Sequence, residues 1–379
     1  MIFTFYFNNS NSLTALYKCL YLQIDIFFHK KRGKNQRKMN KLFYQTAGLL
    51  KNTPLKYFIN ITGKRIIFPF YHCVSDESTL HIKHLYKAKT TRSFEKDLDF
   101  LLKNYAPIDI HTLTQKLNNN ERVKDNCFLL SFDDGLREFY DIIAPILNKK
   151  GIPAICFLNS DFIDNKDLFF RYKESIIIEK ISTSSSKTER QQVEKWLLEK
   201  GLYSNDIESS IKKINYSQKE YLAELAEIVA VDFDDYLEKH KPYLSSEQIK
   251  QLIKQGYALG AHSIDHPLYS DLNLEEQLRQ TKQSVEKIVT SFKLDYKLFA
   301  FPFTDSGVSK DFFETIFSAG NPIADISFGT SGLKNDPCNR NIQRIPIEVD
   351  NFSAEEIIYG EYLYYAVKAL LNKNRIRRS

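Results

Sequence analysis

Short apolar segments alternate with amphipathic helical segments along most of the chain from Arg65 onward. The segment 127–132 (CFLLSF) is apolar throughout, which is typical of a strand that is covered on both faces. Further strands are expected at 65–72, 153–158, 257–261, 298–302, 323–328 and 342–347, with apolar residues at helical spacing between them. This alternation predicts an α/β fold with parallel strands, and a barrel of that kind fits within 379 residues.

Segment 167–240 breaks this rhythm. It is polar, rich in Lys and Glu and mostly helical in pattern, with a Ser/Thr-rich turn at 182–186. We expect a helical insertion on one loop of the barrel. The sequence leaves open whether this insertion is a lid over the active site or a surface elaboration, because long insertions in loops change stability little.

The net charge of +6 is confined to the first 38 residues, which contain seven Lys and Arg residues and one Asp. The remainder of the chain sums to zero, so it has no basic excess of the kind that nucleic-acid binding requires. Met1 and Met39 are the only methionines. We interpret residues 1–38 as an extension that is dispensable or not native, and a membrane-associating segment is the alternative.

Residues 39–379 divide into three further segments. We expect a lead-in at 39–64, a main domain at 65–350 and a C-terminal helix with a basic tail at 351–379. Four basic residues of that tail are expected to be solvated, with contact to an anionic membrane as the alternative. They are Lys373, Arg375, Arg377 and Arg378.

No uninterrupted apolar stretch reaches the roughly 18 residues of a membrane span, and the first positive charges follow the apolar part, the reverse of a signal peptide. The cysteines are odd in number and none forms a CxxC pair; they are Cys19, Cys73, Cys127, Cys156 and Cys338. Buried thiols in a reducing compartment explain them most simply. We therefore expect a cytoplasmic protein, with membrane association through the termini as the alternative.

Two sets of polar residues follow predicted strands. Asp133 and Asp134 come at a carboxyl end, where parallel α/β barrels collect catalytic residues, although a solvated helix cap explains this pair equally well. His262 and His266 also follow a strand, and two histidines four residues apart can converge on one metal ion. One carboxylate with two imidazoles suits zinc as a hydrolytic Lewis acid, and non-haem iron uses the same ligands.

Three motifs resemble those of the polysaccharide deacetylases, the NodB-homology or carbohydrate esterase 4 family. They are Ser131–Gly135 (SFDDG), His262–His266 (HSIDH) and Phe299–Phe303 (FAFPF). The resemblance covers roughly residues 65–350. It implies a deformed (β/α) barrel of the NodB-homology type, interrupted by the helical insertion.

The resemblance also implies roles for individual residues. Asp133 corresponds to the general base, and Asp134, His262 and His266 correspond to the ligands of a divalent metal. Zinc (Zn2+) is expected, with Co2+, Ni2+ or Fe2+ as alternatives. The backbone N–H of Phe303 corresponds to the donor that stabilises the oxyanion, and such donors contribute about 3–4 kcal/mol in the transition state.

The sequence departs from the family pattern in two places. Ala300 stands where the third motif carries an arginine that steadies the base, and no histidine follows His266 to serve as the general acid. The biofilm poly-N-acetylglucosamine deacetylases, a branch with permuted strand order, favour that alanine and take the acid from an N-terminal Tyr-His strand. Phe70–Asp76 (FYHCVSD) is similar to that strand. The resemblance thus implies His72 as the acid, and a structural histidine at a strand end is the alternative.

Together these features predict an enzyme that removes N-acetyl groups from a carbohydrate and releases acetate. Three alternatives stay open. One is an O-acetyl esterase or another amide hydrolase on the same fold, and another is a catalytically inactive carbohydrate-binding relative. The third is a glycosyltransferase that uses Asp133 and Asp134 to hold a metal, which leaves His262 and His266 unexplained. The expected partner is an N-acetylated carbohydrate, and no nucleic acid is expected.

Overall fold

Eight parallel strands form the central sheet of the computed structural model, which describes residues 36–50, 53–119, 121 and 123–378. Their order is β10-β9-β8-β7-β6-β5-β2-β11. The strands are β2 (Pro69–Tyr71), β5 (Leu130–Phe132), β6 (Ala154–Leu158), β7 (Ala258–Ala261), β8 (Leu298–Ala300), β9 (Ile326–Gly329), β10 (Asn341–Gln343) and β11 (Ile345–Pro346). Residues 1–35, and with them Cys19 and most of the predicted extension, lie outside the described part.

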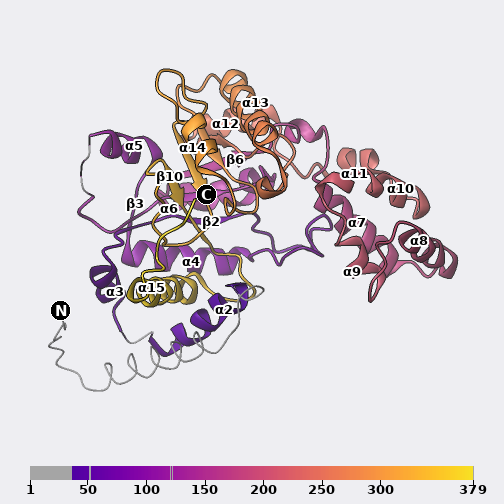
Figure 1. Ribbon diagram of the computed structural model, residues 1–379, viewed down its shortest axis with the longest axis horizontal. Helices are drawn as coiled ribbons and strands as arrows, with labels where there is room; N and C mark the ends of the chain where they lie inside the picture. Colours follow the sequence, from indigo (N-terminus) through magenta and orange to yellow (C-terminus); the bar gives the residue numbers. More distant parts are fainter. Residues whose placement is uncertain (1–35, 51–52, 120, 122, 379) are drawn as a thin grey trace.

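Arg344 alone separates β10 from β11, although these strands form the two edges of the sheet. The edges therefore meet, and the sheet is a nearly closed barrel (Figure 1). This confirms the predicted α/β barrel. A smaller parallel sheet of order β1-β4-β3 is formed by β1 (Ile66–Ile67), β3 (Ala106–Pro107) and β4 (Cys127–Phe128).

Two of the expected strands are each divided into two. Phe68 separates β1 from β2, and Leu129 separates β4 from β5. The division arises because the partners change along the strand: the Phe68 carbonyl already accepts from Ile345 N at 2.8 Å, where β11 joins the barrel. The expected strand at 342–347 is likewise divided, at Arg344.

Helices cover the outside of the barrel. They are α3 (Leu55–Thr62), α4 (Thr91–Asn104), α5 (Ile110–Asn118), α6 (Ala144–Lys150), α12 (Ser246–Lys254), α13 (Leu274–Phe292) and α14 (Lys310–Ile316). A π-helical turn at Phe139–Ile143 leads into α6. The predicted end signals are confirmed, since Ser245 forms a capping box at α12 and Gly151 closes α6 at a φ of 66°. No described helix is long and apolar enough to cross a membrane.

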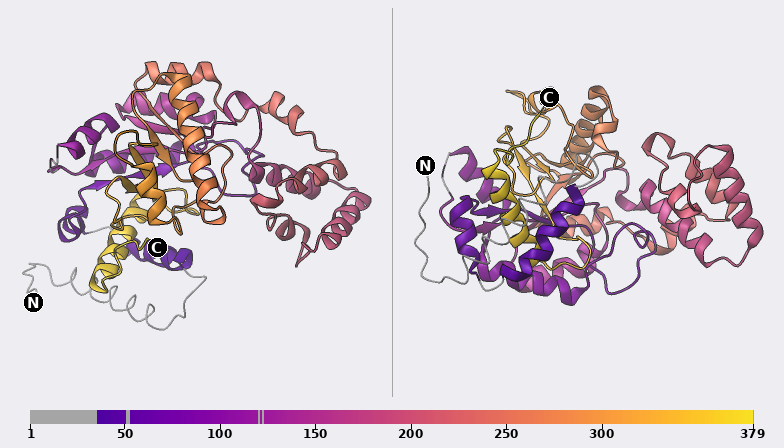
Figure 2. Two further views of the ribbon diagram at one scale, coloured as in Figure 1. Left: turned by 45° about the horizontal axis from the view of Figure 1, so that its top comes forward. Right: turned by 60° about the horizontal axis from the view of Figure 1, so that its bottom comes forward.

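The insertion forms a lobe at one side of the barrel, in pink to red colours (Figures 1 and 2). Its helices are α7 (Phe170–Thr183), α8 (Lys187–Glu199), α9 (Ile207–Ile211), α10 (Tyr221–Ile228) and α11 (Phe233–His240). The lobe has an apolar core of its own, to which Val193, Trp196 and Leu222 belong. Helix α7 is buried on most of its circumference, whereas α8 and α11 each bury only two or three residues, so the outer part of the lobe is polar.

The two ends of the described chain pack together. Helix α2 (Gln36–Ala47) lies against α15 (Ala354–Leu370), as Figure 1 shows, and Tyr44 donates a hydrogen bond to buried Glu361 at 2.7 Å. The lead-in segment is therefore part of the folded body.

The prediction of a wholly solvated basic tail was wrong for Arg378. Its side chain is only 4% exposed and forms ion pairs with Asp305 and Asp336, while Lys373, Arg375 and Arg377 are exposed. Two buried carboxylates need a cation, and this arginine supplies it. The tail also runs beside Asn335, whose carbonyl accepts from Ile376 N at 2.8 Å.

Most of the described cysteines are buried. Cys73, Cys127 and Cys156 are buried, Cys338 is partly buried, and these four described cysteines are free thiols.

Candidate metal centre and active site

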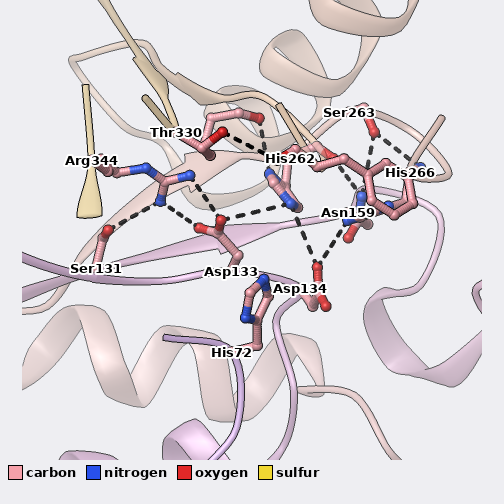
Figure 3. Close-up of polar contacts among 12 residues, drawn as sticks. His72, Ser131, Asp133, Asp134, Asn159, His262, Ser263, His266, Thr330 and Arg344 are labelled. Carbon is pink, nitrogen blue, oxygen red and sulfur yellow. Dashed lines mark hydrogen bonds and ion pairs between the residues drawn. The ribbon is translucent and has the colours of Figure 1, made fainter. Parts of the chain in front are cut away.

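The functional candidates lie at the carboxyl ends of four strands of the barrel. Asp133 and Asp134 follow β5, His262 follows β7, His72 follows β2 and Phe303 comes three residues after β8. Because these strands are parallel, their carboxyl ends share one rim of the barrel. Figure 3 shows the side chains of His72, Asp133, Asp134, His262 and His266 gathered there.

Asp134, His262 and His266 form a compact buried triad whose ligand atoms all lie within 4.8 Å of one another. Oδ1 of Asp134 is 3.2 Å from Nε2 of His266 and 3.5 Å from Nε2 of His262. This oxygen is buried and has no hydrogen-bond partner. A buried carboxylate oxygen without a donor is costly, and a cation between these atoms would satisfy it. The donor set therefore fits a divalent metal.

The tautomer and the protonation state of His262 suit a metal ligand. Its Nδ1–H donates to the carbonyl of Ala300 at 2.9 Å, which leaves Nε2 with a lone pair toward Asp134. Burial lowers the pKa of His262 to about 4, so the imidazole is neutral near neutral pH. Ser263 supports the following turn, since its Oγ accepts from the backbone N of His266 at 3.0 Å.

Arg344 holds the candidate base. Its Nη1 and Nη2 donate to the two oxygens of Asp133 at 2.7 and 2.8 Å, and Nη1 also donates to Ser131 at 3.1 Å. The guanidinium is fully buried and lies 4.3 Å from the ring centre of Phe70. Burial opposes ionisation of Asp133, but the charge of Arg344 outweighs it and holds the pKa of this carboxyl below its usual range.

The position of Ala300 carries no arginine, and Arg344, at the junction of β10 and β11, binds Asp133 instead. The sequence reasoning missed Arg344, which belongs to none of the three motifs. A signal was present, because a lone arginine interrupts the apolar segment 342–347, and a buried charge requires a partner.

Glu348 holds His72 in the same manner. One carboxylate oxygen lies 2.6 Å from Nδ1 of His72 and accepts from its backbone N at 2.6 Å, while the other accepts from Cys73 N at 2.9 Å. Burial disfavours the charged imidazole, but the pairing with Glu348 outweighs it and raises the pKa of His72 to about 9. His72 is therefore protonated at neutral pH. Glu348 was also missed from the sequence.

Phe303 lies at the open edge of the centre. Its side chain is 44% exposed, and its ring packs against His266 with centroids 4.6 Å apart. Its carbonyl accepts from Oγ1 of Thr330 at 3.2 Å. Its backbone N–H donates to no acceptor among the hydrogen bonds of the described residues, which leaves it free for a ligand.

The backbone at this rim is strained. Asp134, Ser263, His266 and Phe303 have φ values of 72°, 69°, 65° and 55°, in the left-handed region that non-glycine residues avoid. Such conformations cluster at functional sites, where the surrounding fold holds them in place.

Two further aspartates, Asp325 and Asp305, each have partners of their own. Asp325 precedes β9, at the opposite end of the barrel, and accepts from Lys297 N at 2.7 Å. Asp305 is engaged by Arg378, Asn341 and Gln343. His72, by contrast, lies beside Asp133 and Asp134 (Figure 3).

The sequence profile of the polysaccharide deacetylase family matches residues 120–320, more than half of the chain. The chain belongs to this family. The matched segment contains all three motifs but neither His72 nor Arg344. The family membership and the buried triad together support a deacetylase-type centre.

Solved structures of several bacterial deacetylases are similar. The deacetylase PplD of Streptococcus pyogenes shares 16% identity at a TM-score of 0.48, over 78% of this chain and 97% of that chain. IcaB of Ammonifex degensii shares 15% identity at a TM-score of 0.48, with the same coverage. A de-N-acetylase of Aggregatibacter actinomycetemcomitans shares 12% identity at 0.43, over 75% and 95% of the two chains. No curated protein matched the sequence.

Proposed function

We propose that this protein is a metal-dependent deacetylase that removes N-acetyl groups from a carbohydrate and releases acetate. The observation that carries the proposal is the placement of an ionised carboxylate and a protonated histidine beside the Asp134–His262–His266 triad. Asp133 is held by Arg344, and His72 is held by Glu348. Hydrolysis of an amide needs an ionised base and a protonated acid. Here a different partner holds each group in the state it needs.

A divalent metal bound by the triad, with zinc expected, would supply a Lewis acid and lower the pKa of a water. Asp133 serves as the general base. Its Oδ2 is 3.9 Å from Nε2 of His262, so the carboxylate borders the metal ligands directly. Because Arg344 keeps it ionised and fixed, Asp133 accepts the proton of the attacking water without reorganising.

His72 serves as the general acid. Its Nδ1 is held by Glu348, so Nε2 carries the proton that reaches the leaving nitrogen. An amine is too basic to depart as an anion, and this proton makes cleavage of the C–N bond feasible. The free N–H of Phe303 donates to the oxyanion of the tetrahedral intermediate.

The protonated His72 favours an amide over an ester as substrate, because an alkoxide leaving group depends less on protonation than an amine does. A glycosyltransferase leaves the two histidines without a role. An inactive carbohydrate-binding relative gives no reason for the buried pair Arg344–Asp133, or for the pairing of the buried Glu348 with the partly buried His72.

The test is an acetate-release assay over N-acetylated and O-acetylated glycans, with and without a chelator. We expect release from an N-acetylated glycan that stops with chelator and returns when zinc is added. Asp133→Asn, which keeps the shape of the side chain, should be inactive yet retain metal. Faster release from O-acetyl groups would favour the esterase, and metal binding without turnover on any glycan would favour the inactive relative.

A further inference from the structure

The first helix of the insertion reaches the metal centre. The hydroxyl of Tyr172, on α7, donates to Oδ2 of Asp134 at 2.8 Å, and the Tyr172 side chain is fully buried. Oδ1 of the same carboxylate carries no hydrogen bond and faces the two imidazoles. Oδ2 of Asp134 thus accepts a hydrogen bond from the insertion, whereas Oδ1 is left available to a metal.

The insertion also contacts the histidine motif. The ring of Phe169, just before α7, packs on His266 with centroids 4.2 Å apart. Further along the lobe, Tyr216 and Lys219 bond the carboxylate of Asp265 at 2.7 and 2.6 Å. Asp265 directly precedes His266, so these contacts fix the loop that carries this ligand.

We infer that the helical insertion is a working part of the metal centre, and that Tyr172 is a positioning residue for the ligand Asp134. The inference rests on the proposed metal site and goes beyond it, because it gives a role to the lobe. A carboxylate that is free to rotate binds a metal with either oxygen or with both. A donor fixed on Oδ2 commits Oδ1 to the metal and keeps the centre in one geometry.

The packing around Tyr172 makes its hydroxyl separable from its ring. The ring lies against His81 and stacks with Tyr243, at centroid distances of 4.9 and 6.2 Å. Tyr172→Phe keeps these ring contacts and removes the donor to Asp134, together with the interaction between the hydroxyls of Tyr172 and Tyr86. Tyr236→Phe is a matched control, because its hydroxyl bonds Nδ1 of His81 at 3.0 Å in the same region and contacts no ligand of the triad.

The experiment measures zinc affinity of the full chain by competition with a chromophoric chelator. Removal of a hydrogen-bond partner from a ligand lowers metal affinity by about 10–100-fold. We expect that loss for Tyr172→Phe, with Tyr236→Phe within about twofold of the wild type. Circular dichroism of the metal-free proteins should be unchanged in both. Equal zinc affinity in Tyr172→Phe and the wild type would overturn the role of Tyr172.

A second variant tests the contact between Lys219 and Asp265, and its result holds even if Tyr172→Phe fails to fold. Lys219→Met removes the cation from Asp265, and Lys213→Met is its control on an exposed lysine of the lobe. We expect weaker zinc binding in Lys219→Met alone. If both Tyr172→Phe and Lys219→Met bind zinc as the wild type does, the lobe has no part in the centre. A wild type that binds no zinc would instead refute the proposed function.

Discussion

Arg344 closes the barrel and holds Asp133 by two parallel hydrogen bonds, 2.7 and 2.8 Å long. It is the single residue between β10 and β11, the strands at the two edges of the sheet. The junction that completes the barrel therefore also fixes the candidate base.

Removal of this arginine should affect both stability and catalysis. Arg344→Met leaves Asp133 buried without a cation, and breaking a buried pair lowers the free energy of unfolding by about 3–5 kcal/mol. Arg344 lowers the pKa of Asp133, so its stabilising effect is present above the ordinary carboxyl pKa and disappears as the pH falls through the lowered value. The acid limb of the kcat/KM profile should accordingly shift to higher pH in the variant.

Chemical denaturation and a pH–rate profile measure these two effects. Arg340→Met is the control, because Arg340 bonds carbonyl groups near the amino end of β9 and not the rim. An unchanged acid limb in Arg344→Met would contradict the assignment of Asp133 as the base.

The pair of His72 and Glu348 should set the alkaline limit of activity. Because the pKa of His72 is raised to about 9, we expect kcat/KM to fall only near that pH. Glu348→Gln removes the negative charge and should move the alkaline limb to lower pH. The pairing stabilises the fold fully below the ordinary histidine pKa of about 6.5, and this effect is lost as the pH rises through about 9. The melting temperatures of wild type and Glu348→Gln should therefore converge at alkaline pH.

Loss of His72 itself should slow the reaction without removing the metal. A general acid contributes about 10²–10⁴-fold, so His72→Ala should lower kcat on an amino sugar substrate by that factor. Aryl acetates, whose leaving group needs less protonation, should be affected less. Metal content is measured alongside the rates. Near wild-type deacetylation of an amino sugar by this variant would show that another group donates the proton.

Each ligand of the triad should be indispensable for metal binding. Asp134→Ala, His262→Ala and His266→Ala remove one of three buried donors, and we expect none of them to retain stoichiometric metal or activity. His84→Ala is a suitable control, because His84 bonds Glu179 at 2.8 Å and belongs to no ligand set. Elemental analysis after dialysis gives the metal content. Tight stoichiometric metal in any of the triad variants would refute the site.

Truncation at Met39 should leave a folded, active protein. It keeps Phe43 and Tyr44 of α2, which are buried against α15. A truncation that begins at Thr53 removes Tyr44 and leaves the buried Glu361 without this donor, which should lower the melting temperature clearly. The two truncations are compared by thermal unfolding and acetate release. A large loss in the protein that starts at Met39 would show that residues 1–38 contribute to the fold.

The sequence predicts the barrel and the triad well because both depend on local patterns. An apolar segment followed at once by Asp133 and Asp134 describes a strand and its carboxyl end, and the same holds for His262. Parallel strands then bring these ends to one rim, whatever the details of packing.

Arg344, Glu348 and Tyr172 escape prediction for a physical reason. Each reaches its partner only through the closed barrel or the docked lobe, across a long stretch of chain, and none has a fixed spacing from a motif. Glu348 lies 276 residues from His72, and Arg344 lies 211 residues from Asp133. Contacts of this kind depend on tertiary structure, which periodicity does not encode.

The left-handed backbone at Asp134, His266 and Phe303 has a consequence for protein engineering. Each such residue disfavours the fold by about 1–2 kcal/mol relative to a conformation that suits its side chain, whereas Gly135 adopts a φ of 66° next to them without that penalty. Glycine in place of Asp134 or His266 would relieve this strain but remove a ligand of the triad, whereas glycine in place of Phe303 would keep the backbone N–H. Stability and function therefore conflict at Asp134 and His266, so a screen for more stable variants of this protein will tend to collect inactive ones.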